Sequence, residues 1–148
     1  MNQWLLAGAA LAVAATSGVT AYAAAEAQGG VKLSATLTGP AEVPGPGDAD
    51  GHGSFTARVN LGQGQVCYTL SWSNLAPATM AHIHIGAAGV AGGVLVALKV
   101  ESDNDVTDCV ALPHDKAMEL IKNPAGFYVN VHTGDHPGGA IRGQLAKG

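Results

Sequence analysis

Two short stretches of this sequence carry the residues best suited to bind a metal ion. Residues 81–86 read Ala-His-Ile-His-Ile-Gly, and residues 128–133 read Tyr-Val-Asn-Val-His-Thr. Three neutral imidazoles are enough for a zinc or copper site that keeps one coordination position open. Residue type and spacing therefore make His82, His84 and His132 candidate ligands for copper or zinc, and imidazole suits both metals.

Both stretches alternate apolar and polar residues, which is the period of a half-buried β-strand. In the first stretch Ile83 and Ile85 share one face, so His82 and His84 share the other. In the second stretch the apolar residues again share one face, and the opposite face holds Tyr128, Asn130 and His132. If the two strands are close neighbours in a sheet, the three histidines converge.

A further strand is expected to extend this polar face. A turn over residues 134–139 leads into a last strand over residues 140–146, where Ile141 and Leu145 must face inward. The residues expected to surround the histidines, or to contact an anion, are Asn130, Arg142 and Gln144.

The polar face has an alternative interpretation without a metal. It can be a hydrogen-bonded network that pins the loops at residues 86–93 and 134–139 onto the sheet. Arg142 favours this alternative, since a nearby cation disfavours a divalent metal unless Asp135 neutralises it.

Other candidate sites in the sequence have weaker signatures. Asp48 and Asp50 precede a glycine, and four acidic residues lie between Glu101 and Asp108, but neither group has the EF-hand spacing of a calcium site. Solvated loops explain both groups. We find no nucleophile elbow, phosphate-binding loop or catalytic triad, so we assign no catalytic residue and expect no enzyme. The remaining histidines are expected on the surface: His52, His114 and His136.

Length and composition indicate one β-rich domain. A chain of 148 residues with 47% hydrophobic residues can bury one core, and 21 glycines with only 12% charged residues favour strands and tight turns over long helices. Alternating segments at intervals of roughly ten residues predict an all-β antiparallel sandwich or barrel. The net charge of -4, without a basic stripe, argues against nucleic-acid binding. Besides those named above, the predicted strands are 31–38, 52–60, 65–72 and 94–98.

Three further segments complete the predicted layout. Residues 94–98 form a continuous apolar run, which predicts a strand buried on both faces or against another apolar layer. Residues 101–108 are predicted to be an acidic loop. Residues 114–122 form the one short helix we expect, which Asn123 and Pro124 end.

The N-terminal segment has the pattern of a secretory signal peptide. Residues 5–19 are rich in Ala, Leu and Val without a charge, and small-x-small cleavage sites follow at residues 21–25. We therefore expect a signal peptide over residues 1–25 and a secreted or periplasmic domain over residues 26–148. The alternative is an uncleaved membrane anchor, which would be the only link to a membrane.

Export gives a meaning to the only two cysteines, Cys67 and Cys109. In an oxidising compartment we expect them to form a disulfide that closes a loop of about 43 residues. Two buried thiols or a thiolate metal site are the alternatives.

Several of these motifs together resemble the CHRD domain, a family named after the developmental protein chordin and widespread in bacterial secreted proteins. The similarity covers about residues 31–146. It implies an immunoglobulin-like β-sandwich or barrel and brings no established catalytic activity. The motifs that carry the resemblance are residues 81–84, the pair Cys67 and Cys109, residues 123–124, residues 127–133 and residues 137–145.

A second resemblance is local. The His-x-His of residues 82–84, followed by Gly86, is similar to the copper-ligating strand of Cu,Zn superoxide dismutases, which implies that His82 and His84 are copper ligands. The other dismutase ligands have no matching positions here, and only fold-level analogy compares Arg142 with an anion-guiding arginine.

The sequence therefore predicts a secreted or periplasmic CHRD module with a binding or structural role and without established catalysis. Its partner would be an unidentified protein or small ligand. The alternative function is copper or zinc binding at His82, His84 and His132, for metal handling or dismutase-like redox protection.

Overall fold

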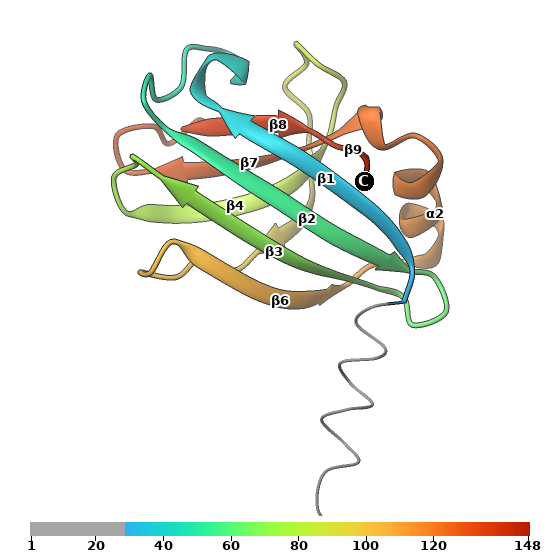
Figure 1. The fold of residues 1–148 in the computed structure, drawn as a ribbon. Coiled ribbons are helices and arrows are strands. Elements are labelled where there is room, and N and C mark those ends of the chain that lie inside the picture. The colour runs from blue at the N-terminus through green and yellow to red at the C-terminus, as the bar shows by residue number, and fades with distance from the viewer. Residues whose placement is uncertain (1–28) are drawn as a thin grey trace, which may run out of the picture.

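A computed structural model of the protein describes residues 29–148, and the predicted signal peptide lies outside the described residues. Figure 1 shows an antiparallel β-sheet that curls until it is nearly closed into a barrel, with one short helix at its end. This architecture confirms the predicted all-β class with one short helix. None of the helices within residues 29–148 is long and apolar enough to cross a membrane.

The elements follow the predicted alternating segments closely. The 3₁₀ turns are η1 (Gly39–Ala41) and η2 (Pro124–Gly126), and the helix is α2 (His114–Lys122). The strands are β1 (Val31–Thr38), β2 (His52–Asn60), β3 (Gln65–Ser73), β4 (Ala78–Ile85), β5 (Val94–Leu98), β6 (Asp105–Ala111), β7 (Phe127–Thr133), β8 (Ile141–Gln144) and β9 (Ala146–Lys147).

The strand order sets which segments meet. Along the sheet it is β5-β4-β7-β8-β1-β2-β3-β6, and β9 pairs with β1. The core fills the inside of the curled sheet because each strand turns one apolar face inward. The helix α2 contributes Ala117 and Leu120, both fully buried. Examples of fully buried strand residues are Leu33, Val66, Ile83, Val129 and Ile141.

Two predictions about the apolar and acidic segments were wrong in part. The run over residues 94–98 is β5 at one end of the sheet, and it is not buried on both faces, since Val94 is 54% exposed. Its contact with an apolar layer is partial, because Leu98 is buried and Leu95 and Val96 pack half-buried against the core. An edge strand has a neighbour on one side only, which the apolar run alone does not reveal. The acidic segment enters a strand at Asp105, where β6 begins to pair with β3. Pairing with an existing strand outweighs the low strand propensity of the acidic residues.

The predicted disulfide is present between Cys67 and Cys109, 42 residues apart in sequence. The two cysteines are directly opposite each other in the pairing of β3 with β6. Since β6 is the last strand at its end of the sheet, the disulfide ties this edge to the barrel.

Replacing both cysteines by alanine should lower the free energy of unfolding by about 3–4 kcal/mol, because the crosslink restricts the unfolded chain. Urea unfolding of the oxidised protein and of the double variant measures this difference. Hydrogen exchange should rise most in β6, which would retain only its pairing with β3. Equal midpoints of unfolding for the two proteins would show that the disulfide adds no stability.

Candidate functional site

The histidines lie on two strands that are neighbours in the sheet. β4 pairs with β7 in antiparallel register, which sets Met80 opposite His132, His82 opposite Asn130, and His84 opposite Tyr128. Opposite residues of an antiparallel pair point to the same side of the sheet. All these side chains therefore share the outer face of the barrel, as the alternation predicted.

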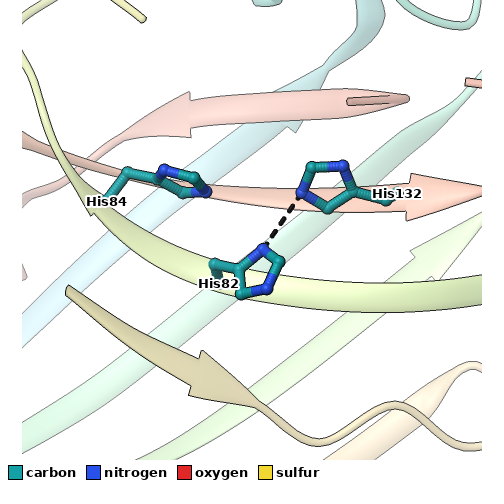
Figure 2. Close-up of side chains that lie close together, drawn as sticks. All are labelled: His82, His84 and His132. Carbon is teal, nitrogen blue, oxygen red and sulfur yellow. Dashed lines mark hydrogen bonds between the residues drawn. The ribbon is translucent and has the colours of Figure 1, made fainter. Parts of the chain in front are cut away.

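The three histidine rings converge on one point. One nitrogen from each of His82, His84 and His132 lies within 4.8 Å of the other two. Figure 2 shows these nitrogens turned toward the space between the rings, with Nδ1 of His82 3.1 Å from Nε2 of His132. The predicted histidine cluster is thus present as a geometric arrangement, and its occupation by a metal stays a prediction.

Backbone carbonyls fix the tautomers of two of the rings. Nδ1 of His84 lies 3.0 Å from the carbonyl oxygen of Gly92, and Nδ1 of His132 lies 3.0 Å from that of Pro137. A carbonyl only accepts hydrogen bonds, so each Nδ1 carries the proton and each Nε2 presents its lone pair. Nε2 of His84 is buried without a hydrogen-bond partner among the described residues.

The third ring completes the hydrogen bonding around His132. Because Nε2 of His132 is an acceptor, Nδ1 of His82 is the donor of their shared hydrogen bond. Oδ1 of Asn130 lies 3.1 Å from Nε2 of His132. Because both atoms are acceptors, the amide bonds to the ring when it is turned so that its NH₂ group faces Nε2. Asn130 therefore contacts the imidazole of His132, and the role predicted for it around a metal stays a prediction.

The surroundings of His82 and His132 favour the neutral form of each imidazole. Burial lowers the pKa of His82, and the nearby His132 and His84 lower it further. Burial also lowers the pKa of His132, against an opposing effect of the Pro137 carbonyl. A neutral imidazole is the form that binds a metal.

The loop between β4 and β5 covers this face of the sheet. Its Gly92 accepts the hydrogen bond from His84, and the backbone N–H of Gly92 donates to the phenolic oxygen of Tyr128. A side chain at position 92 would overlap the carbonyl oxygen of Ile85, so glycine is required for this close approach. Gln144 donates to the Gly86 carbonyl. The loop-pinning hydrogen bonds of the alternative interpretation are therefore present, and they also orient the imidazoles.

Arg142 is almost fully buried, at 1% exposure, although it carries a charge. Its guanidinium donates to the carbonyl of Ala87 and to the side chain of Gln144, and it lies 3.4 Å from the ring centroid of Tyr128. The Tyr128 ring also stacks on the ring of His84, with the two ring centroids 4.7 Å apart. No carboxylate in residues 29–148 lies within 4.0 Å of Arg142, so Asp135 does not neutralise it.

The fold brings Glu42 to this region, although no sequence motif marks this residue. Glu42 is 5% exposed, and burial raises its pKa to about 7, although the charge of Arg142 lowers it. Glu42, Arg142 and Gln144 line one surface cavity of 290 Å³. Glu42 follows η1 in a segment rich in proline and glycine, and such a sequence is typical of an exposed surface loop.

The weaker candidate sites do not form a metal-binding cluster within the described residues. Asp48 accepts hydrogen bonds from the backbone N–H groups of Asp50 and Gly51, which closes a turn. His52 is exposed and contacts Ser73, as expected for a surface residue. Within the described part of the chain, the histidine cluster is the one group of three or more such side chains that is close enough to hold a metal.

The fold and this polar face define a class: a small antiparallel β-barrel, crosslinked by one disulfide, whose outer face is a buried network of imidazoles, an arginine and backbone carbonyls. The model of the CHRD domain family matches residues 33–145. The match spans most of the chain, so the protein belongs to the CHRD family. Neither the search of curated proteins nor the search of solved structures gave a match. The local similarity to the dismutase copper strand stays a prediction.

The buried carboxyl of Glu42 should make stability depend on pH. Its pKa is higher in the folded protein than its ordinary 4.5, so the folded state holds the proton more tightly. The resulting stabilisation is complete below pH 4.5 and is lost as the pH rises through 7. Relative to Glu42→Gln, the wild type should lose about 2–3 kcal/mol of unfolding free energy across this range.

Urea unfolding of both proteins at several pH values measures this difference. The comparison isolates Glu42 because this side chain is the only difference between the two proteins. Glu101→Gln, at an exposed position, is the control and should follow the wild type. Parallel profiles for wild type and Glu42→Gln would contradict the prediction.

Proposed function

We propose that this chain is an exported CHRD module that acts by binding, without catalysis of its own. The observation that carries this proposal is the outer face of β4, β7 and β8, where polar side chains are buried under two loops. Burying polar groups is costly unless they are fully hydrogen-bonded, and a simple structural barrel does not need them. Nε2 of His84 and Nη1 of Arg142 have no partner within the described residues, which supports a ligand at this face.

Export is supported by three independent features. The segment over residues 1–25 has the signal-peptide pattern, the two cysteines form a disulfide, and the family is typical of secreted proteins. Disulfides persist in oxidising compartments and are rare in the cytosol.

Expressed with its leader in a Gram-negative bacterial host, the protein should be found in the periplasm without residues 1–23 or 1–25. Mass spectrometry of the periplasmic fraction measures both the processing and the oxidised cysteines. A variant with Leu11→Asp, which interrupts the apolar run, is the control and should remain full-length in the cytoplasm. Full-length wild type attached to the membrane would support the anchor instead and contradict processing.

A second function, metal binding by His82, His84 and His132, is favoured by the tautomers. The two carbonyl contacts leave lone pairs on Nε2 of His84 and of His132. Hydrogen bonding of the remote ring nitrogen to a carbonyl is the usual arrangement of metal-binding histidines. The hydrogen bonds to the Gly92 and Pro137 carbonyls serve both the network and a metal site. A metal bound at Nε2 of His132 would replace the hydrogen bonds that this nitrogen accepts from His82 and Asn130.

The spacing of the nitrogens also fits a metal ion. Three atoms no more than 4.8 Å apart lie within about 2.8 Å of a common point. Bonds from copper or zinc to imidazole are about 2.0–2.1 Å long. Movements of less than about 1 Å would therefore bring the three nitrogens to bonding distance.

The wild type should retain about one equivalent of copper or zinc after loose ions are removed, because three preoriented imidazoles bind as a chelate. Elemental analysis measures this content. The variant with alanine at His82, His84 and His132 should retain none. The matched control replaces His52 and His114, which lie outside the cluster, and should bind like the wild type. No retained metal in a folded wild type would contradict the metal site but not the binding module.

A further inference from the structure

Met80 lies beside the histidine cluster on the same face of the sheet. It is directly opposite His132 in the pairing of β4 with β7, and it precedes His82 by two residues on β4. The two Cβ atoms of such an opposite pair are about 5 Å apart, within the reach of a long flexible thioether. Met80 is nevertheless 48% exposed, so core packing does not account for a methionine at this position.

We propose that Met80 is the fourth ligand of this site and that the ion it accepts is monovalent copper. The inference rests on the proposed metal site and goes further by naming the ion and a ligand. His82, His84 and His132 would supply three nitrogens, and Met80 would supply a sulfur from the exposed side.

The donor set favours a soft ion. A thioether is a soft ligand that selects Cu(I), whereas zinc in proteins takes thiolate, imidazole or carboxylate donors. The sulfur of Met80 therefore adds affinity for Cu(I) and little affinity for Zn(II).

The local charge also favours an ion of lower charge. The metal-binding cluster in residues 29–148 contains no carboxylate. The Arg142 guanidinium lies over the Tyr128 ring, and that ring stacks on the ring of His84. The positive charge of Arg142 is therefore close to the cluster. Repulsion between Arg142 and an ion grows with the charge of that ion, so a divalent ion is disfavoured about twice as strongly as a monovalent one.

One acidic group acts on Arg142 without joining the cluster. The carboxyl of Glu42 lies within electrostatic range of Arg142 but forms no ion pair with it. Because burial raises the pKa of Glu42 to about 7, this carboxyl is only partly charged at neutral pH. The positive charge of Arg142 is thus only partly compensated next to the site.

The exposed side of the cluster provides a route for the ion. His84 and His132 are buried at 8% and 7% exposure, and His82 is only partly buried. With Met80 exposed next to them, an ion can enter and leave on the side of His82 and Met80. This arrangement suits an exchangeable site rather than a permanently enclosed one.

The test compares affinities for Cu(I) and Zn(II) in the purified protein with its disulfide intact. Competition with a chromogenic Cu(I) chelator, with ascorbate as a reductant that spares disulfides, gives the first affinity, and a Zn(II) indicator gives the second. Met80→Leu keeps the volume of the side chain and removes the sulfur. It should weaken Cu(I) binding at least tenfold and change Zn(II) binding less than twofold.

Methionine methyl signals in NMR provide a second, direct readout. The chain has three methionines, and Met118 on α2 serves as the matched control. Addition of Ag(I), a redox-inert substitute for Cu(I), should shift the methyl signal of Met80 and leave that of Met118 in place. Met118→Leu should bind Cu(I) like the wild type.

The outcomes separate this inference from the metal site itself. If metal binds through the histidines but the Met80 signal does not move and Met80→Leu binds Cu(I) normally, Met80 is not a ligand. Tighter binding of Zn(II) than of Cu(I) would overturn the monovalent preference. If the folded wild type binds neither ion, both the inference and the three-histidine site are wrong.

Discussion

The antiparallel register between β4 and β7 is the constraint on which the candidate site depends. It sets Met80 opposite His132 and His82 opposite Asn130, so that all three histidines share one face. Because side chains alternate with a period of two, a slip of one residue in this pairing would turn His82 and His84 into the core. The apolar residues Ile83 and Val129, both fully buried, prevent such a slip.

The hydrogen bonds of this face have two consequences at once. The bonds from His84 to Gly92 and from His132 to Pro137 hold two loops on the sheet, and they also decide which ring nitrogens keep their lone pairs. A polar network buried in this way is stable only when its members are satisfied. Five buried side-chain polar atoms within residues 29–148 have no hydrogen-bond partner, and two of them, Nε2 of His84 and Nη1 of Arg142, belong to this network and mark where a ligand would add the most.

The electrostatic balance of this face is unusual for a metal site. A buried arginine stacks on Tyr128, the histidine cluster contains no carboxylate, and burial raises the pKa of the nearby Glu42 to about 7. The family match identifies the domain but not its ligand. The charges on this face affect which ions or molecules could bind there.

The sequence by itself determined most of the strands, the helix, the cysteine pair and the strand face of His82, His84 and His132, because alternation, turn residues and the helix stop are local signals. The convergence of His82, His84 and His132 required only the further assumption that two strands are neighbours. Tertiary structure alone decided that β5 is an exposed edge, that β6 begins within the acidic segment, and that Glu42 is buried near Arg142. These features depend on contacts between segments far apart in the chain, and no local pattern encodes which segments meet.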